Sequence, residues 1–543
     1  MAIPLLTSAT NAIILSWGWR RNVIAFTSGA ASALALPPFS FFPVLFVTFP
    51  ILILLIDGAL PVPGKGKFGA MRPAAMTGWL FGFGYFLAGL WWIGSAFLVE
   101  AETFAWLIPF AVAAMPAGLA LFWAAAAALA RAFWPGGPAR ILVLAGAFSI
   151  LEYLRANVLT GFPWNAPGYA LAAHDITMQA ASIVGLHGMT LFAFIVFSVP
   201  VLAFGPARDK GLAFGFAACA GALLAGITVF GLIRLAGADQ AVHDNVMLRI
   251  VQPNIAQADK WKPELKSRHF NDLLALSDQR QSPGTGGIGD ITHLIWPETA
   301  LPFLLSNARG EMSALAALLP PQSHLITGAF RTEPVPSHPL GRKVYNSIYV
   351  IGDDGTIIDA YDKLHLVPFG EYLPFQSLFD AIGLAPLTRQ IGGFSAGQNR
   401  QNLRIGAAPP ALPLICYEVA FPDLDGSSPA RPGWLLNLTN DAWFGITPGP
   451  YQHFHQARLR AVEQGLPLVR AANTGISGIV DAYGRVRKIL GLDQRGIVQG
   501  RLPVSLASTP FSRYGSRIFI LLVAISLIFA LMCHRLMAPQ HRK

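Results

Sequence analysis

Three short stretches in the second half of the chain carry the side-chain types needed for acyl transfer. Glu298 follows the letters WP, Lys363 begins the run KLHLVPFGE, and Cys416 stands in the run LICYE. A carboxylate can accept a proton, an ammonium can hold a developing oxyanion, and a thiol can attack a carbonyl carbon. Together these residues predict a complete set of groups for moving an acyl chain.

Short apolar runs precede the three residues and predict how they are positioned. The runs are residues 293–296, 356–358 and 412–415. Runs of this length and composition are typical of buried strands. Each reactive side chain is therefore expected where a strand ends and a loop begins, which is a usual place for catalytic groups.

The order Glu, Lys, Cys and the letters around each residue resemble the carbon-nitrogen hydrolase (nitrilase) superfamily. Two longer runs, KLHLVPFGEYLPF over residues 363–375 and LLNLTNDAWFG over residues 435–445, resemble the bacterial apolipoprotein N-acyltransferase family. The resemblance implies a nitrilase-like α/β domain, built as an α-β-β-α sandwich, that is joined to a polytopic α-helical membrane domain.

The same resemblance implies roles for the reactive residues. Cys416 would be the nucleophile that forms a thioester, and Glu298 the general base that takes the thiol proton. Lys363 would stand beside the oxyanion and lower the pKa of the thiol by its charge. Glu371, later in the same run, would orient Lys363, with a purely structural salt bridge as the alternative.

Further residues are expected to support the site or to bind substrate. Tyr417 and Glu418 directly follow the nucleophile and match positions that the resembled family needs for activity. Trp261 matches a family tryptophan linked to substrate handling, although simple packing in a polar loop is the alternative. Asn437 and the Asx residues that follow it should line the site by resemblance, and turn formation is their alternative role.

The three cysteines separate into two groups. Cys219 and Cys533 fall in or beside apolar segments, so Cys416 has no partner for a disulfide within the soluble part of the chain. A lone thiol in an oxidising compartment is a liability unless it reacts, which favours a nucleophile. A small buried core residue is the alternative.

The composition predicts a membrane protein. The chain has 543 residues, of which 53% are hydrophobic and 13% charged, whereas soluble domains are roughly 25% charged. A bilayer span needs about 20 apolar residues, and about eight candidates meet or approach that length. They cover residues 22–36, 41–57, 77–97, 104–130, 140–154, 185–204, 211–233 and 518–532.

The start of the chain could also be interpreted as a signal peptide, because the letters ASA at residues 31–33 imitate a cleavage site. Further apolar segments follow at once, which favours a first helix that is retained.

The cations predict the orientation of these segments, because short cytoplasmic loops are rich in Lys and Arg. Alternate loops hold Arg20, Arg21, Lys65, Lys67, Arg72, Arg131, Arg140, Arg208, Lys210, Arg535, Arg542 and Lys543. We therefore expect a protein of the bacterial inner membrane with both termini in the cytoplasm. The expected domains are a membrane domain over 1–237, a periplasmic hydrolase-like domain over 238–508, and a terminal helix with a cytoplasmic tail over 509–543.

The soluble domain alternates short apolar runs with helical stretches, which predicts an α/β layered fold. The predicted strands are residues 246–251, 291–296, 324–330, 347–352, 355–359, 411–416, 434–438, 468–471, 479–481 and 497–500. The predicted helices are residues 263–278, 311–319 and 452–464.

The net charge of +10 could suggest a nucleic-acid partner. The basic residues gather in the loops between apolar segments, so membrane topology explains the charge and no nucleic acid is expected. His453 and His455 form an H-x-H pair, but the segment is predicted to be helical, where residues two apart point in different directions. No metal and no cofactor are expected.

The resemblance implies an N-acyltransferase that acts in lipoprotein biosynthesis, as a monomer. The acyl donor would be a phospholipid such as phosphatidylethanolamine, and the acceptor the α-amine of the lipidated N-terminal cysteine of an apolipoprotein. Two alternatives stay open. One is a membrane-tethered amidase or nitrilase acting on a small soluble substrate, and the other is a non-enzymatic membrane protein, such as a transporter with an outer binding domain.

Overall fold

The chain divides into two compact units in the computed structural model. One contains Met1–Ala238 together with Ser508–Lys543, and the other contains Asp239–Ala507. The structure describes residues 2–61, 66–204, 210–238, 240–280, 287–338, 341–374, 393–424 and 430–537. Several residues used in the sequence predictions lie outside these ranges, namely Lys65, Arg208, Phe375, Arg542 and Lys543.

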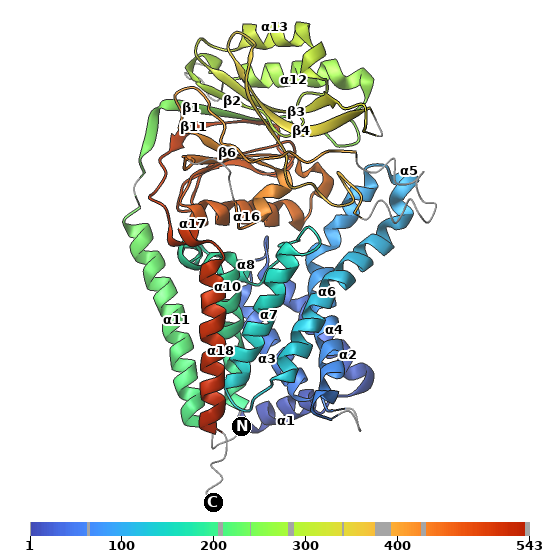
Figure 1. Ribbon diagram of the computed structural model, residues 1–543, viewed down its shortest axis with the longest axis vertical. Helices are drawn as coiled ribbons and strands as arrows, with labels where there is room; N and C mark the ends of the chain where they lie inside the picture. Colours follow the sequence, from blue (N-terminus) through green and yellow to red (C-terminus); the bar gives the residue numbers. More distant parts are fainter. Residues whose placement is uncertain are drawn as a thin grey trace, which may run out of the picture. The chain divides into compact units, whose positions relative to one another are not determined.

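The first unit is helical (Figure 1). Its helices are α1 (Ala2–Ile14), α2 (Gly18–Ser32), α3 (Leu45–Asp57), α4 (Met71–Leu90), α5 (Ala101–Phe104), α6 (Ile108–Ala132), α7 (Ala139–Asn157), α8 (Gly168–Leu171), α9 (Asp175–Met178), α10 (Ala181–Ser198), α11 (Lys210–Ala236), α17 (Pro510–Tyr514) and α18 (Arg517–Met537). Every predicted apolar segment falls mainly within one of these helices or its 3₁₀ continuation, and α1 is an additional helix that the hydropathy pattern did not predict.

Among the described residues, four helical segments are long and apolar enough to cross a membrane. They are Phe68–Leu98, Ala101–Ala132, Ala181–Phe204 and Lys210–Ala236. Phe42–Asp57 and Arg517–Cys533 are shorter apolar helices. These helices fit a membrane domain, while the count of about eight spans stays a prediction.

Close helix contacts and one buried ion pair hold this unit together. A Cβ atom added to Gly84 of α4 would lie 2.1 Å from the main-chain oxygen of Phe26 in α2, so glycine allows the two backbones to approach. On α7, the Arg155 guanidinium lies 2.6 Å from the Glu152 carboxylate, and both side chains are 1% exposed. The Trp123 indole donates to the same carboxylate at 2.7 Å. The buried charges are therefore paired and hydrogen-bonded, as a membrane interior requires.

The second unit contains two β-sheets. One sheet has the strand order β11-β1-β2-β3-β4-β5 and the other has the order β10-β9-β8-β7-β6. The strands are β1 (Val242–Gln252), β2 (His293–Ile295), β3 (His324–Pro334), β4 (Arg342–Gly352), β5 (Ile357–Asp362), β6 (Ala411–Ile415), β7 (Trp434–Thr439), β8 (Leu468–Ala472), β9 (Ser477–Val480), β10 (Val486–Leu490) and β11 (Gly496–Pro503). Each predicted strand is present, and β10 is an additional one.

The two sheets pack face to face with helices on their outer sides (Figure 1). One cluster of buried residues joins the sheets through side chains such as Ile250, Ile348, Ile415 and Val469. Helices α12 (Lys266–Asp278) and α13 (Arg309–Leu318) cover the six-stranded sheet, and α16 (Pro448–Gln464) covers the five-stranded sheet. The unit is therefore the α-β-β-α sandwich that the resemblance implied.

Strand direction explains why distant sequence motifs can meet. Strands β1, β2 and β3 are mutually parallel neighbours, as are β6, β7 and β8. The carboxyl ends of parallel strands lie at one edge of a sheet, and ligand sites of α/β folds gather there. Glu298 follows β2, Lys363 follows β5 and Cys416 follows β6, so each stands just beyond a strand end.

Candidate active site

Cys416 stands on a tight turn between β6 and the 3₁₀ helix η11 (Cys416–Ala420). Its φ is 49°, a left-handed value that is uncommon for residues other than glycine. Hydrogen bonds hold the turn on both sides, because Ile415 N donates to Glu418 Oε2 at 2.7 Å and Cys416 O lies 3.2 Å from His453 Nε2. A strained residue persists where its surroundings fix it, and such residues cluster at functional sites.

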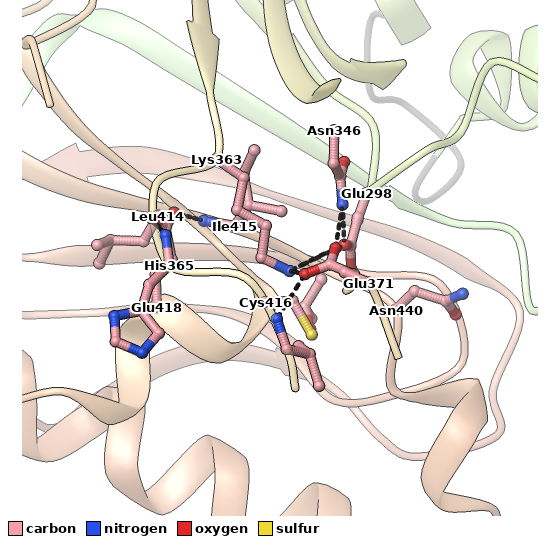
Figure 2. Close-up of polar contacts among 12 residues, drawn as sticks. Glu298, Asn346, Lys363, His365, Glu371, Leu414, Ile415, Cys416, Glu418 and Asn440 are labelled. Carbon is pink, nitrogen blue, oxygen red and sulfur yellow. Dashed lines mark hydrogen bonds and ion pairs between the residues drawn. The ribbon is translucent and has the colours of Figure 1, made fainter. Parts of the chain in front are cut away.

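Lys363 lies in a buried cluster with the two carboxylates that the sequence singled out. Its Nζ lies 2.9 and 2.8 Å from the two oxygens of Glu371 and 3.9 Å from Glu298 Oε1. Asn346 of β4 donates from Nδ2 to Glu298 at 2.7 Å and to Glu371 at 3.1 Å. Figure 2 shows this group of side chains beside Cys416.

The loop after β2 fixes Glu298 by its main chain. Trp296 is fully buried, and its indole donates to Ser277 of α12 at 2.8 Å. Gly328 N donates to Pro297 O at 3.1 Å, so the loop lies directly on β3. A Cβ atom on Gly328 would stand 2.7 Å from the Cα of Glu298, which means that only glycine leaves room for the loop.

Glu418 connects the loop of Lys363 to the turn of Cys416. One of its oxygens, Oε1, accepts from the Tyr361 hydroxyl at 2.7 Å, from Leu364 N at 3.1 Å and from Arg400 Nη2 at 2.9 Å. The other oxygen accepts from Ile415 N. The side chain is fully buried, so its predicted supporting role takes the form of a structural tie.

A second buried network lies behind Cys416. Asn437 donates to Leu414 O at 3.0 Å and also contacts the guanidinium of Arg470. Asp441 lies 2.7 Å from Arg470 Nη2 and 2.9 Å from His453 Nδ1. Asn437 and Asp441 are 0% exposed. Their hydrogen bonds to protein groups give them a supporting position under the nucleophile.

Tyr417 and Trp261 differ in exposure. Tyr417 is 6% exposed and its ring packs edge-on against Phe421, with centroids 5.0 Å apart. Trp261 is 37% exposed and stacks on Phe330 at 5.0 Å. The stacking confirms a packing contact for Trp261, and its partly open face leaves substrate contact as a prediction.

Burial and neighbouring charge set the protonation of the cluster. Burial, and secondly the charge of Glu298, raise the pKa of the Cys416 thiol to about 12, although Lys363 acts to lower it. The charge of Lys363 therefore acts in the expected direction, but burial outweighs it. Burial also raises the pKa of Glu298, against the opposing effect of Lys363. The pKa of Lys363 is raised despite burial, because Glu371 and Glu298 stabilise its ammonium.

These shifts define a resting site with a neutral thiol and a charged lysine. A carboxylate with a raised pKa is a stronger base, so the difference in proton affinity between Glu298 and the thiol is reduced. Once the thiol is deprotonated, its charge would stand near the Lys363 ammonium. The cluster can thus generate a nucleophile and hold a developing oxyanion in a site shielded from water.

The Lys363 ammonium and its carboxylate partners are already paired with one another. Among the residues that the structure describes, no group of three or more His, Cys, Asp and Glu side chains is arranged to hold a metal ion. His453 instead belongs to the network behind Cys416, where burial and Arg470 lower its pKa.

Four residues close to the reactive group were not singled out by their motifs. They are Asn346, Lys260, Arg470 and, as a partner of Cys416, His453. Asn346 and Arg470 are buried polar residues inside strands, and Arg470 interrupts an otherwise apolar one. A buried polar residue in a strand needs a partner, so this interruption was the one signal that could have found them.

Comparisons with known proteins find matches to both parts of the chain. A model described as carbon-nitrogen hydrolase matches residues 292–510, a range that includes Glu298, Lys363 and Cys416, and places the α-β-β-α unit in that class of proteins. A model described as the apolipoprotein N-acyltransferase N-terminal domain matches residues 28–199.

Similar proteins span the whole chain. An apolipoprotein N-acyltransferase of Rhodopseudomonas palustris is 48% identical over 534 residues, 98% of each chain. One of Bradyrhizobium diazoefficiens is 48% identical over 540 residues, 99% of each chain. The chain therefore belongs to the apolipoprotein N-acyltransferase family. A solved amidase from Nesterenkonia sp. AN1 is 17% identical, with a TM-score of 0.33, and the match covers 49% of this chain and 94% of the amidase.

Proposed function

We propose that the chain is an N-acyltransferase that moves a fatty acyl chain from a phospholipid to the α-amine of the lipidated N-terminal cysteine of an apolipoprotein. The observation that carries this proposal is the buried cluster of Glu298, Lys363 and Glu371 beside Cys416, in a chain whose full-length relatives are named for this transfer. The reaction would proceed in two halves through a thioester on Cys416.

In the first half, Cys416 attacks the ester carbonyl carbon of the phospholipid. Its thiol proton passes to Glu298 as the carbon–sulfur bond forms, and the oxyanion develops beside the Lys363 ammonium. The bond from the carbonyl carbon to the glycerol oxygen then breaks, and Glu298 returns the proton to that oxygen. The products are a lysophospholipid and a thioester on Cys416.

In the second half, the α-amine of the acceptor attacks the thioester carbonyl. Glu298 takes a proton from the amine nitrogen, and the carbon–sulfur bond breaks. The proton passes to the sulfur, so an amide leaves and the thiol is restored. One base can serve both halves because each half moves one proton toward and one away from the same carboxylate.

The supporting residues have distinct tasks in this scheme. Glu371 accepts a hydrogen bond from the Lys363 ammonium, and Asn346 donates to the carboxylates of both Glu298 and Glu371. Glu418 ties the loop of Lys363 to the nucleophile turn. Trp261 offers an aromatic surface to the substrate, while Tyr417, directly after the nucleophile, packs against Phe421.

The proposed setting is the bacterial inner membrane. The distribution of cations predicts that both termini face the cytoplasm and that the hydrolase-like domain, over 238–508, faces the periplasm. Both substrates are held in a bilayer by acyl chains, so about eight spans over 1–237 and 509–543 would keep the catalytic domain next to them. We expect the chain to act as a monomer, without a cofactor.

Intact-protein mass spectrometry tests the first half directly. The full-length protein is incubated with phosphatidylethanolamine and no acceptor, beside Cys416→Ala and the matched control Cys219→Ala. We expect the mass of one fatty acyl group on the wild type and on Cys219→Ala, labile to hydroxylamine, and none on Cys416→Ala. Adding a diacylglyceryl-cysteine peptide should then remove the adduct and acylate the peptide.

No adduct from reduced, folded protein with an adequate phospholipid supply would contradict the transferase. Release of ammonia from small amides by the same preparation would instead support the membrane-tethered amidase. An adduct that persists in Cys416→Ala would assign the acyl group to another residue.

A further inference from the structure

A second buried lysine lies next to the candidate base. Lys260, which directly precedes Trp261, is 4% exposed. Its Nζ donates a hydrogen bond to the main-chain oxygen of Glu298 at 3.1 Å and lies 5.7 Å from the centre of the Trp261 ring. The transfer described above gives Lys260 no task, although a buried ammonium costs stability unless its surroundings compensate it.

The charges around Cys416 indicate what that task is. Glu298 and Glu371 carry two negative charges, and Lys363 supplies one positive charge beside them. These three groups have a net charge of −1, and the charge of Lys260 brings the net charge of the four groups to zero. A buried site with a net negative charge would oppose both the ionisation of Glu298 and the formation of a thiolate or an oxyanion.

The geometry adds a second effect. The loop that carries Glu298 rests on β3 through Gly328 on one side and accepts the Lys260 hydrogen bond on the other. The carboxylate is then directed by Asn346 toward Lys363. Lys260 thus acts on Glu298 twice: its hydrogen bond fixes the main chain, and its positive charge stabilises the ionised side chain.

We propose that Lys260 is a positioning residue for the acyl transfer, which fixes the main chain of Glu298 and, together with Lys363, supplies positive charge that favours the ionised carboxylate. The inference rests on the proposed function, because it assigns Glu298 the role of base. It adds a fourth charged residue to the cluster of Glu298, Lys363 and Glu371.

The groups that face Lys260 come from several elements. Glu298 lies on the loop after β2 and Cys416 on η11. The carboxylate, and the thiolate when it forms, both favour the Lys260 ammonium. His269 of α12 lines the same small crevice as Lys260. Asp259, the preceding residue, is paired with Lys262 at 2.6 Å, so it is engaged elsewhere. Burial lowers the pKa of Lys260 to about 8, which leaves the side chain charged at neutral and acidic pH.

The sign of the effect on Glu298 follows. The Lys260 charge lowers the pKa of Glu298 and so opposes the effect of burial. Removing that charge raises the pKa of Glu298, and the acidic limb of the rate profile, where Glu298 becomes protonated, moves to higher pH. We expect a displacement of about one pH unit, equivalent to about a tenfold loss of rate on that limb.

The experiment compares Lys260→Met, Lys260→Arg and the control Lys262→Met in the full-length protein. Lys262 is two residues away and its side chain is 50% exposed, so its replacement changes the net charge equally and removes only a surface ion pair with Asp259. The rate of thioester formation on Cys416 from phosphatidylethanolamine is measured by mass spectrometry from about pH 5 to about pH 9, a range that brackets the raised pKa of a buried carboxylate. Thermal unfolding of each variant shows whether it is folded.

We expect Lys260→Met to form the thioester with its acidic limb displaced upward, while Lys260→Arg and Lys262→Met retain the wild-type limb. If the acidic limb of Lys260→Met lies at the same pH as that of the wild type, the proposal is overturned and Lys260 is a structural residue. This holds whatever the maximal rate of the variant. An equal displacement in Lys260→Arg would also overturn the proposal, because arginine keeps the charge. Failure of the proposed function is a separate result, since the wild type itself would then form no thioester.

Discussion

His453 Nε2 lies 3.2 Å from the main-chain oxygen of Cys416, so a helix of the outer layer holds the residue that carries the nucleophile. A carbonyl oxygen accepts, which makes Nε2 the donor. The other ring nitrogen lies 2.9 Å from Asp441 and 3.0 Å from Arg470. Glu418 accepts a hydrogen bond from the amide of the preceding residue, Ile415. Together with the bond from His453, this contact maintains the left-handed conformation of Cys416.

Replacing His453 by Leu should therefore slow acylation without abolishing it. The change leaves a buried carbonyl without its donor, which costs about 1–3 kcal/mol and would misplace the thiol. We expect thioester formation in a single turnover to slow by about 10- to 100-fold. His455→Gln, on the same helix, is the matched control. A wild-type rate in His453→Leu would show that the bond does not position the nucleophile.

Glu371→Gln should reduce the rate and narrow the pH range. The carboxylate accepts from Lys363, Asn346 and Val367 N, and an amide cannot accept through its nitrogen. Because the charge of Glu371 helps to raise the pKa of Lys363 against burial, its loss lowers that pKa, and the alkaline limb moves to lower pH. We expect a loss of about 100-fold or more in the rate of thioester formation.

The isosteric control for this change is Glu264→Gln on the protein surface. Rates are measured by mass spectrometry across alkaline pH for both variants. If Glu371→Gln loses rate equally at every pH, Glu371 acts by geometry alone and its charge is not required.

Gly328→Ala tests the packing that fixes Glu298. The added methyl group would stand 2.2 Å from Thr299 N and 2.7 Å from the Cα of Glu298, so the loop must move away from β3. A shift of about 1 Å at a catalytic group can cost about 100-fold in rate. We expect such a loss in thioester formation, while Cys416 still reacts with a small alkylating reagent.

Gly310→Ala on α13 serves as the control for Gly328→Ala, since a Cβ there meets nothing within 4 Å. It should retain the wild-type rate. Normal acylation in Gly328→Ala would mean that the loop tolerates displacement and that Glu298 is not held by this contact.

The motifs indicated the candidate residues and correctly predicted the strands that precede them, because both leave local signals. Glu298, Lys363 and Cys416 stand at the ends of apolar runs, and the structure gathers the two charged side chains with Glu371 in one buried cluster. The pairing of the two sheets came from the family resemblance, since strand order has no signature in a single run. Strand β10 was missed because its exposed, basic composition does not resemble a buried strand.

The groups behind the reactive residues could not be predicted in the same way. Asn346 meets Glu298 across 48 positions of sequence, and Lys260 meets its main chain across 38. Such contacts depend on how the strands pair and how the loops close, and neither is recorded in a short motif. His453 belongs to an H-x-H pair in the sequence, yet its partners are Asp441, Arg470 and the main-chain oxygen of Cys416, which no sequence pattern identifies.

Acid should destabilise the hydrolase-like unit through His293, a residue remote from the reaction. It is 1% exposed, pairs in register with His324 of β3, and has ring nitrogens 2.7 Å from Thr292 Oγ1 and 3.2 Å from Ile405 O. Burial lowers the pKa of His293 to about 4. In the unfolded chain His293 binds a proton near the ordinary histidine pKa of about 6.5, whereas in the folded chain it does so only at lower pH.

The free energy of unfolding should therefore fall as pH drops from about 6.5 to about 4, by roughly 3 kcal/mol from this group. Replacing His293 by Gln removes the proton uptake by this residue. The free energy of unfolding of the His293→Gln variant should therefore depend less steeply on pH between about 4 and about 6.5, whatever its value at pH 7. Urea unfolding midpoints, followed by tryptophan fluorescence at several pH values, measure the slope, with His243→Gln as control. Equal slopes in the wild type and His293→Gln would show that other groups, such as buried carboxylates, govern the acid response.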